Sequence, residues 1–366
     1  FLILSLAFGL QSCGGSGGNA DDPEPGPEPG APKAKVSFAL KSDINGVQDN
    51  DLKTALTHLR LYLYDKDQKL VSVNKYTSAD ALKAIELEKG NYTVVLIGNV
   101  PEDGNISSEA TGTPLSGMSV QLTKADGATH YTPLGDVMFA KSTLTVDDKD
   151  LTVGLSVKRT LSATKVQLTD YSGQISDAGV LVPGVGTRFG FGDNKWTEPG
   201  TVFVTMKAGA VTKAAETGKQ YNISLNVTIV NTTGEFEKKI QCNIIARDET
   251  GQVLAAQLLE VPATTQPNTE VSLNLSVESD PAETGKINVS VSEVEVKNED
   301  VTPDDITKQE TDIDPDLTPE DWTTGNEEDI EIGTKEDFIT PGGQANDWQQ
   351  GEDEQVTFDS TNLQFR

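Results

Sequence analysis

The chain has 366 residues and a formal net charge of −28, and it contains only two cysteines and two histidines. This charge disfavours nucleic acid and anionic lipid headgroups as partners, because both attract lysine and arginine. Cys13 and Cys242 are too few for a disulfide framework or a paired-cysteine metal motif. His58 and His130 lie far apart in sequence, which argues against histidine-based metal or catalytic chemistry. The length predicts two or three domains.

Residues 1–12 are the first predicted element, a signal peptide whose charged start is missing. An apolar run from Phe1 to Gly9 leads into Leu-Gln-Ser-Cys at 10–13, which looks like a bacterial lipoprotein signal. The run is shorter than the ~20 residues that cross a bilayer. We therefore expect the thiol of Cys13 to carry a lipid that anchors the chain to a membrane. The alternative is a secretory signal that contains a cysteine by chance.

Residues 13–33 are predicted to form a disordered tether. A Gly/Ser-rich first part is flexible, a Pro-rich second part is stiffer, and neither supplies side chains for a core. Such a tether holds a folded body away from a lipid surface. Asp21 and Asp22, close to Cys13, resemble the acidic surface-export signal of Bacteroidetes lipoproteins.

Residues 34–160 are predicted to form a first β-sandwich, because apolar and polar residues alternate in short runs. The runs 59–65 and 70–73 are joined by a polar turn and predict a hairpin. The nearly continuous apolar run 92–98 predicts a central strand that is buried on both faces. Further strands are expected at 36–40, 137–140, 144–146 and 151–157, with helical turns within 50–58 and 78–86.

Residues 161–296 are predicted to form a second β-sandwich. Cys242 is in phase with the apolar residues around it and is expected to be a buried, inert side chain. After Val291 the alternation changes phase, since Glu293 stands where an apolar residue is due, and this predicts a β-bulge or a strand end. The expected strands are 163–168, 202–206, 223–229, 236–246, 253–259, 271–277 and 287–291. The expected fold class is therefore all-β, with two tandem antiparallel β-sandwiches and an extended acidic C-terminal region.

Residues 297–366 form this acidic extension, with a net charge of −17. Two units in it, residues 321–332 and 347–358, each read Asp-Trp-x-x-Gly, then an acidic patch, then a short alternating apolar end. A tryptophan is costly to leave in water, so each unit is expected to dock on a surface or a partner, and the alternation predicts short extended strands. The alternative is a disordered acidic tail. The candidate docking or donor-strand residues are Trp322, Ile330, Ile332, Trp348, Val356 and Phe358.

No catalytic or metal-binding motif is found. The acidic run at 312–316 lacks the EF-hand pattern, because Leu317 and Thr323 stand where that loop needs Gly and Glu. The sequence contains no nucleophile elbow, zinc-protease motif or phosphate loop. Most clustered carboxylates lie in the tail, where water screens them. We therefore predict no catalytic residue, no metal and no cofactor, and we do not expect an enzyme.

Two segments carry a resemblance to a known family. Residues 59–71 resemble a hairpin of Bacteroidetes fimbrial subunits, in which an aromatic-Asp strand end is followed by a turn and Leu-Val. Residues 87–99 contain Gly-x-Tyr-x-Val-x-x-x-Gly-Asn, which resembles another strand of the same proteins. Together with the lipoprotein signal and the Asp-Trp-x-x-Gly units, these segments resemble the fimbrillin-like, or type V pilus, subunits.

The resemblance implies transthyretin-like sandwiches, export as a lipoprotein to the outer membrane and cell surface, and assembly with other fimbrial subunits. In shaft subunits of this family a protease removes the lipidated segment and the first strand, and a neighbour's C-terminal strand fills the groove by strand addition. The strand removed here would be 36–40, with Lys33, Lys35 or Lys41 as cleavage points. The family's shaft cleavage usually involves arginine, and no arginine precedes Arg60, which favours an anchor or accessory subunit.

These observations predict a structural subunit of a surface fimbria that supports adhesion. Its partners would be other fimbrial subunits, in a homo- or heteropolymer, and a membrane through the lipid on Cys13, but not nucleic acid. The alternative is a cell-surface glycan-binding lipoprotein, which would need exposed aromatic platforms, and the two predicted sandwiches contain only Trp196. A surface glycosidase or protease is a third hypothesis.

Overall fold

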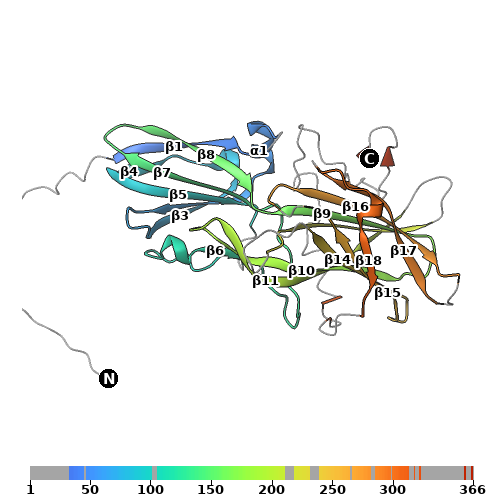
Figure 1. The fold of residues 1–366 in the computed structure, drawn as a ribbon. Helices are drawn as coiled ribbons and strands as arrows, with labels where there is room; N and C mark the ends of the chain where they lie inside the picture. The colour runs from blue at the N-terminus through green and yellow to red at the C-terminus, as the bar shows by residue number, and fades with distance from the viewer. Residues whose placement is uncertain are drawn as a thin grey trace, which may run out of the picture. The chain divides into compact units, whose positions relative to one another are not determined.

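The computed structural model consists almost entirely of β-strands, which confirms the all-β fold class (Figure 1). The described residues belong to one compact unit that begins at Lys33. The structure describes residues 33–322 apart from 45–46, 101–104, 211–217, 231–238, 264–265, 282–284, 298, 313–316 and 318–320, together with 358–359 and 364–365.

The first sheet has seven strands in the order β3-β2-β5-β7-β8-β1-β4. Strands β7 and β8 pair only near one end, at Met138–Arg159 and Phe139–Lys158, so the sheet folds over there into two layers. Figure 1 shows β8 and β1 in one layer and β5 and β3 in the other. The bounds are β1 (Lys33–Ser42), β2 (Thr57–Tyr64), β3 (Leu70–Ser78), β4 (Ile85–Glu88), β5 (Gly90–Gly98), β7 (Met138–Val146) and β8 (Leu151–Arg159).

A hydrophobic core fills the space between these layers, because alternate residues of each strand are apolar and face inward. It is formed mainly by Val36 and Leu40 of β1, Leu59, Leu61 and Leu63 of β2, Val94 and Leu96 of β5, Leu144 and Val146 of β7, and Val153, Leu155 and Val157 of β8.

The predicted hairpin and the predicted central strand are both confirmed. Strands β2 and β3 pair in antiparallel register, and the carboxylate of Asp65 accepts hydrogen bonds from the backbone N–H groups of Asp67 and Lys69 in the turn. Strand β5 lies between β2 and β7, and four successive residues from Val94 to Ile97 are at most 1% exposed. Val94 and Leu96 enter the core just described, whereas Val95 and Ile97 enter a second one.

The helical content is small. Within the predicted range 50–58 the structure has the helix α1 (Asp49–Ala55), and within 78–86 it has only the 3-10 turn η1 (Ala79–Ala81). Two further turns are η2 (Leu115–Gly117) and η3 (Pro303–Asp305). In the described part of the chain no helix has the length and apolar character needed to cross a bilayer.

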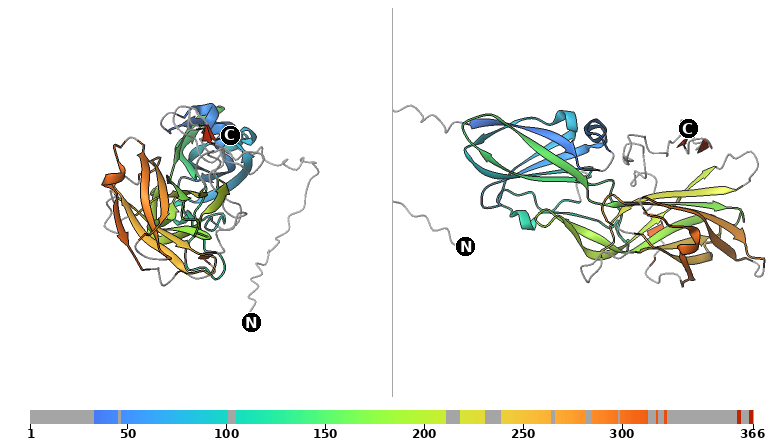
Figure 2. Two further views of the ribbon diagram at one scale, coloured as in Figure 1. Left: turned by 90° about the vertical axis from the view of Figure 1, so that its right-hand side faces the viewer. Right: turned by 45° about the horizontal axis from the view of Figure 1, so that its top comes forward.

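A second sheet and a third sheet follow. The second sheet has the order β11-β10-β14-β15-β18, and β6 also pairs with β10; the third has the order β12-β13-β9-β16-β17. Figure 1 shows β9 and β16 on one side and β10, β14 and β15 on the other, and Figure 2 gives two further views. The bounds are β6 (Ser119–Gln121), β9 (Ser162–Asp170), β10 (Asp177–Gly190), β11 (Lys195–Thr205), β12 (Lys207–Ala210), β13 (Lys219–Val227), β14 (Ile240–Arg247), β15 (Val253–Val261), β16 (Glu270–Ser279), β17 (Ile287–Val296) and β18 (Thr307–Glu310).

The core between the second and third sheets contains Cys242, which is completely buried among apolar side chains. Burial raises the pKa of its thiol to about 12, so the thiol stays protonated and unreactive at neutral pH. The predicted phase change after Val291 is a β-bulge: Leu275 pairs with Val291 and Asn274 with Glu293, which leaves Ser292 as the extra residue.

Two strand pairs run parallel, β1 with β8 and β9 with β16, so the sheets are mixed rather than purely antiparallel. The alternation that predicts a strand carries no information about the direction of its neighbour, and the sequence did not indicate either pair.

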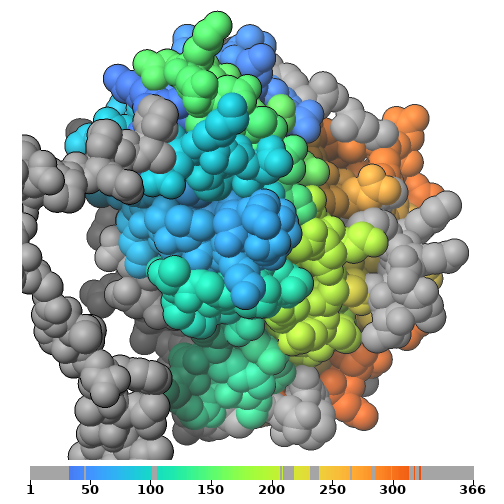
Figure 3. All heavy atoms as spheres, turned by 90° about the vertical axis from the view of Figure 1, so that its left-hand side faces the viewer, coloured from blue at the N-terminus to red at the C-terminus, as the bar shows by residue number. Residues whose placement is uncertain are grey.

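The segment between β5 and β7 joins the first sheet to the second. Its strand β6 pairs with β10, and one continuous core runs from Tyr62 and Ile97 of the first sheet to Phe189 and Trp196 of the β10–β11 hairpin. Figure 3 shows the teal atoms of this segment against the blue atoms of the first sheet and the yellow-green atoms of β10–β11. A division into two separate domains at residues 160 and 161 stays a prediction.

Candidate functional site

Strand β1 is an interior strand of the first sheet. It pairs in parallel with β8 over Val36–Ser42 and in antiparallel with β4 over Lys33–Val36. Ala34, Val36 and Leu40 are buried, and Phe38 packs against the same core, so four alternate residues face inward. Because β4 is held in the sheet only through β1, removal of β1 would open a groove along β8 and release β4.

The three candidate cleavage lysines all lie within β1. Lys33, Lys35 and Lys41 are exposed and alternate with the buried residues. Their backbone is part of the strand: Lys33 pairs with Glu88, Lys35 with Glu86, and Lys41 with Ser156. A protease binds its substrate as an unpaired extended segment, so cleavage at these lysines requires β1 to leave the sheet first.

The chain after β17 returns across the second sheet. Strand β18 pairs with β15 at the edge of this sheet, and its four residues, all polar or charged, are exposed, which protects the edge from further pairing. The backbone N–H of Thr311 then donates to the carbonyl of Ala256. Beyond this point Leu317 and Trp322 pack on Leu181, Phe203 and Ile245, on the face of the sheet opposite to the core.

Asp321 is 1% exposed, and its carboxylate is held by a loop far away in sequence. The backbone N–H groups of Thr129 and His130 each donate to Oδ1 at 3.0 Å, and the Thr129 hydroxyl donates to Oδ2 at 2.7 Å. Nδ1 of His130 lies 3.2 Å from Oδ1. Three donors directed at one carboxylate compensate for its removal from water.

The pairing of Tyr131 with Val202 explains why this loop lies beside Phe203. Tyr131 forms a parallel bridge to Val202, and its N–H donates to the carbonyl of Thr201 at 2.9 Å. The bridge fixes Thr129 and His130 next to β11, from which Phe203 and Thr205 project to the outer face.

The indole of Trp322 lies between an aromatic ring and a cation. Its ring centroid is 5.0 Å from that of Phe203, and the guanidinium carbon of Arg247 is 4.0 Å from the indole centroid, a cation–π arrangement. The hydroxyl of Thr205 donates to the carbonyl oxygen of Trp322 at 2.9 Å. Gly179 makes room for this packing, because a Cβ there would lie 2.5 Å from Cζ of Phe203.

Thr129, His130, Phe203, Thr205 and Arg247 thus form a site for one aspartate and one tryptophan, which we call the Asp–Trp socket. A hollow of about 360 Å³ lies on the same face and shares Leu181 and Ile245 with the packing under Leu317 and Trp322. The sequence pointed to Trp322 but not to the socket residues. They come from a loop and two strands whose proximity depends on long-range pairing, and no local pattern in them indicated a site.

The other tail candidates are placed differently. Ile330, Ile332, Trp348 and Val356 lie outside the described residues, as does Cys13. The backbone of Phe358 belongs to β19 (Phe358–Asp359), which pairs with β20 (Gln364–Phe365) in a two-stranded sheet. The structure therefore brings Trp322 together with the second sheet and brings β1 together with the first.

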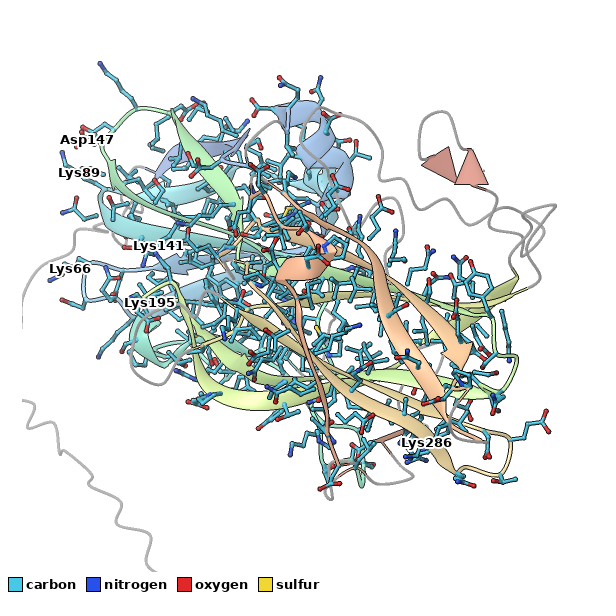
Figure 4. All side chains as sticks on the ribbon, turned by 45° about the vertical axis from the view of Figure 1, so that its right-hand side comes forward. Lys66, Lys89, Lys141, Asp147, Lys195 and Lys286 are labelled. Carbon is cyan, nitrogen blue, oxygen red and sulfur yellow. The ribbon has the colours of Figure 1, made fainter. Side chains whose placement is uncertain are left out.

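The described residues contain no group of three or more His, Cys, Asp or Glu side chains placed to hold a metal ion. Trp196 is 7% exposed, donates its N–H to the carbonyl of Thr160 at 2.9 Å and packs on Phe189, so it is a core residue. A second hollow, of about 380 Å³, lies at one end of the first sheet beside Lys66 and Tyr92. Figure 4 shows Lys66 projecting outward there.

Comparison with known proteins gives consistent findings. A family model described as fimbrillin-A associated anchor proteins Mfa1 and Mfa2 matches residues 27–300. Among solved structures, a candidate adhesin from Bacteroides thetaiotaomicron is 14% identical with a TM-score of 0.50, and the alignment covers 75% of this chain and 99% of that one. A candidate adhesin from Bacteroides ovatus is 13% identical with a TM-score of 0.52, covering 73% and 96%.

The fimbrial anchor protein Mfa2 from Porphyromonas gingivalis is 12% identical, with a TM-score of 0.46 and coverage of 74% of this chain and 99% of that one. At these identities the two candidate adhesins support the fold alone. Among curated proteins, none matches the sequence.

Proposed function

Since the chain belongs to the family of fimbrillin-A associated anchor proteins, we propose that it is a lipid-anchored subunit that fixes a fimbria to the outer membrane. The family supports its association with fimbriae and a structural rather than an enzymatic role. The anchor role, the lipid on Cys13 and the contacts with other subunits are the proposal. The apolar run before Cys13 and the Gly/Ser- and Pro-rich residues after it support attachment by a lipid and a tether.

The inward face of β1 gives the strongest support for an anchor rather than a shaft subunit. Four alternate residues, Ala34, Val36, Phe38 and Leu40, fill the first core from this strand. In residues 323–366, by contrast, no run places apolar residues at more than two successive alternate positions. A copy of the chain's own tail would therefore fill the β1 groove incompletely, which favours retention of β1 over its replacement.

The polar surroundings of the candidate cleavage sites support the same conclusion. Lys33 and Lys35 are paired in the sheet, and the N–H of Lys35 also donates to the carboxylate of Asp150 at 2.8 Å. These contacts must break before a protease can bind the segment. A folded chain with β1 in place keeps the covalent connection between its sheets and Cys13, as an anchor requires.

The glycan-binding alternative has less support. Surface platforms for sugars need exposed aromatic rings, and Trp196 is buried in the core. Among the described residues the large hydrophobic side chains counted as exposed are Val71 and Tyr171, each 42% exposed, which is too little for a platform.

The experiment compares Cys13→Ala with Ser16→Ala in a Bacteroidetes host labelled with a clickable palmitate analogue. Ser16 lies in the tether, outside the lipoprotein signal, and the substitution is equally small. We expect the wild-type chain and Ser16→Ala to be labelled, to sediment with outer membrane and to co-purify with other fimbrial subunits. Cys13→Ala should lose the label and the membrane association. A Cys13→Ala chain that remains labelled and membrane-bound would contradict the proposal.

A further inference from the structure

The dipeptide held by the Asp–Trp socket occurs twice in the chain. Asp321-Trp322 and Asp347-Trp348 are 26 residues apart, and each is followed by two residues and a glycine. Both lie beyond residue 300, outside the residues that the family model matches. The contacts that hold the first unit in the socket are made by Asp321 and Trp322, and the second unit repeats these two residue types.

We propose that the Asp–Trp socket is a binding site for an acidic–aromatic dipeptide and that it also takes Asp347–Trp348 of the same chain, in place of Asp321–Trp322. The tail then has two registers on the second sheet. In one, residues 321–322 occupy the socket; in the other, residues 347–348 occupy it and the residues between the units form a loop.

The chemistry of the contacts carries this inference. The socket donates three hydrogen bonds to a carboxylate, at 2.7–3.0 Å, and a fourth to the carbonyl oxygen of the following residue, at 2.9 Å. It also stacks Phe203 and Arg247 on the indole of that residue. Among the described residues of the unit, which are Asp321 and Trp322, the contacts involve a carboxylate followed by an indole. Any segment with this pair therefore meets the same donors and the same aromatic surface.

The geometry of the chain favours its own second unit over that of another copy. Among the described residues, the last backbone hydrogen bond before the socket runs from the N–H of Thr311 to the carbonyl of Ala256. From Thr311 the chain reaches the first unit in 10 residues and the second in 36. Because closing the longer loop costs more entropy, the register with the second unit bound is less populated than the register with the first unit bound, but only about sevenfold. A second copy would have to reach roughly millimolar concentration to compete with such an intramolecular segment.

Exchange of the two units changes which residues are available to partners. With the first unit bound, the proposal has residues 323–346 tethered to the socket at one end only. With the second unit bound, the same residues are closed into a loop that is tied to the second sheet at both ends. A partner that recognises Ile330 and Ile332 as an extended strand would therefore meet them in two different states.

The test uses tryptophan fluorescence in the full chain. In Trp322→Ala the remaining tryptophans are Trp196, which is buried, and Trp348. We expect acrylamide to quench Trp348 several-fold less in this variant than in the control Trp322→Ala/Asp347→Ala, in which the second unit lacks its carboxylate. Equal quenching in the two variants, at the level of a free peptide, would overturn the proposal. Circular dichroism and thermal unfolding verify that both variants fold.

A second measurement follows the binding of an added peptide, so it does not depend on the fluorescence of the chain's own Trp348. A fluorescent peptide spanning residues 345–358 is titrated into the wild-type chain, into Trp322→Ala/Trp348→Ala and into the latter with Arg247→Ala. We expect saturable binding that is at least about tenfold tighter in the doubly substituted chain than in wild type, because the socket is empty. Arg247→Ala should then weaken it about tenfold. A peptide that does not bind, or that binds regardless of Arg247, contradicts the proposed site.

Measurement of the molecular mass in solution shows whether the second unit in the socket belongs to the same chain or to a second copy of it. Trp322→Ala should remain monomeric from low to high micromolar concentration, because its own Asp347–Trp348 fills the socket. If protection of Trp348 from quenching appears only together with a concentration-dependent dimer, the occupant comes from a second copy and the two-register proposal for a single chain is wrong.

Discussion

The carboxylate of Asp321 accepts a 3.0 Å hydrogen bond from the backbone N–H of His130, a residue 191 positions earlier in the chain. Both residues are almost completely buried. The contact ties the acidic extension to the loop between β5 and β7, which itself pairs with the second sheet through Tyr131 and Val202. Within the described residues, the extension is thus held on the folded part by the Asp–Trp socket as well as by β18.

The first prediction concerns the strength of this attachment. Asp321→Asn keeps one acceptor oxygen but removes the negative charge, and hydrogen bonds to a charged acceptor contribute about 1.5–3 kcal/mol. We expect the docking of Leu317 and Trp322 to weaken by about 2 kcal/mol, with faster amide hydrogen exchange in peptides from Thr307 to Trp322. The exposed Asp312→Asn is the matched control and should leave exchange unchanged. Equal exchange rates in the two variants would show that the Asp321 carboxylate does not hold the segment.

The second prediction concerns a buried ion pair where β8 ends. Nε of Arg159 lies 2.7 Å from Oδ2 of Asp136, and both side chains are 2% exposed. Removing one partner of such a pair leaves the other charge buried, which typically costs about 3–5 kcal/mol. Asp136→Ala should lower the free energy of unfolding by this amount in urea titrations, even though Arg159 also donates to Asn268 at 3.1 Å.

The control for this variant is an ion pair on the surface of the same sheet. Lys89 and Asp147 lie 3.6 Å apart and are 65% and 70% exposed, at the outer end of the strands in Figure 4. Asp147→Ala should change stability by less than about 0.5 kcal/mol, because water screens exposed pairs. If Asp136→Ala and Asp147→Ala lower the free energy of unfolding by similar amounts, the buried pair between Arg159 and Asp136 does not stabilise the fold more than an exposed pair does.

The third prediction concerns pH. Burial disfavours the charged form of Glu109, but hydrogen bonds from Tyr62 and Lys75 and the charge of Arg60 outweigh it and hold the pKa of Glu109 below its ordinary value. A group whose pKa is lowered by folding stabilises the folded state above its unfolded pKa, about 4.3, and this contribution is lost as pH falls through the folded pKa.

Glu109→Gln removes this contribution. The difference in stability between wild type and variant should be constant near neutral pH and should shrink on acidification below about pH 4.3. Urea titrations at a series of pH values, from neutral to below about pH 4.3, measure this difference in stability. A difference that is independent of pH over this range, or that grows in acid, would assign the effect to packing rather than to the charge of Glu109.

The fourth prediction tests whether β1 belongs to the mature protein. Val36 is 0% exposed, so Val36→Ala should destabilise the first sheet by about 2 kcal/mol. Lys35→Ala, at the adjacent exposed position, should stay within about 0.5 kcal/mol of wild type. Thermal unfolding of protein purified from the cell surface provides the measurement. If Val36→Ala has no effect there, the strand has been removed or replaced.

Local sequence patterns were sufficient to predict many of the strands. Alternation and a polar turn predicted the β2–β3 hairpin, a continuous apolar run predicted β5, and the phase change at Glu293 predicted the bulge opposite Asn274. In each case the side chains along one short segment decide which face is buried, and that information is present in the sequence itself.

Long-range relationships were not predicted. The parallel pairing of β1 with β8 and the addition of β6 to β10 depend on how separate segments pack, and alternation within one strand is the same for either neighbour. Trp322 could be recognised as an aromatic residue that needs cover. Trp322 packs against Phe203 and Arg247, and the loop at Thr129 binds the carboxylate of its neighbour Asp321. These residues lie in segments that are remote from Trp322 in sequence.

The most direct test of the anchor proposal is mass spectrometry of the N-terminus of the protein purified from the outer membrane. Our account predicts that the mature chain begins at Cys13, that this residue carries a diacylglycerol, and that peptides covering Lys33–Ser42 are present. A mature chain that begins between residues 34 and 42, without the lipid and without an intact β1, would contradict it and would identify a processed shaft subunit.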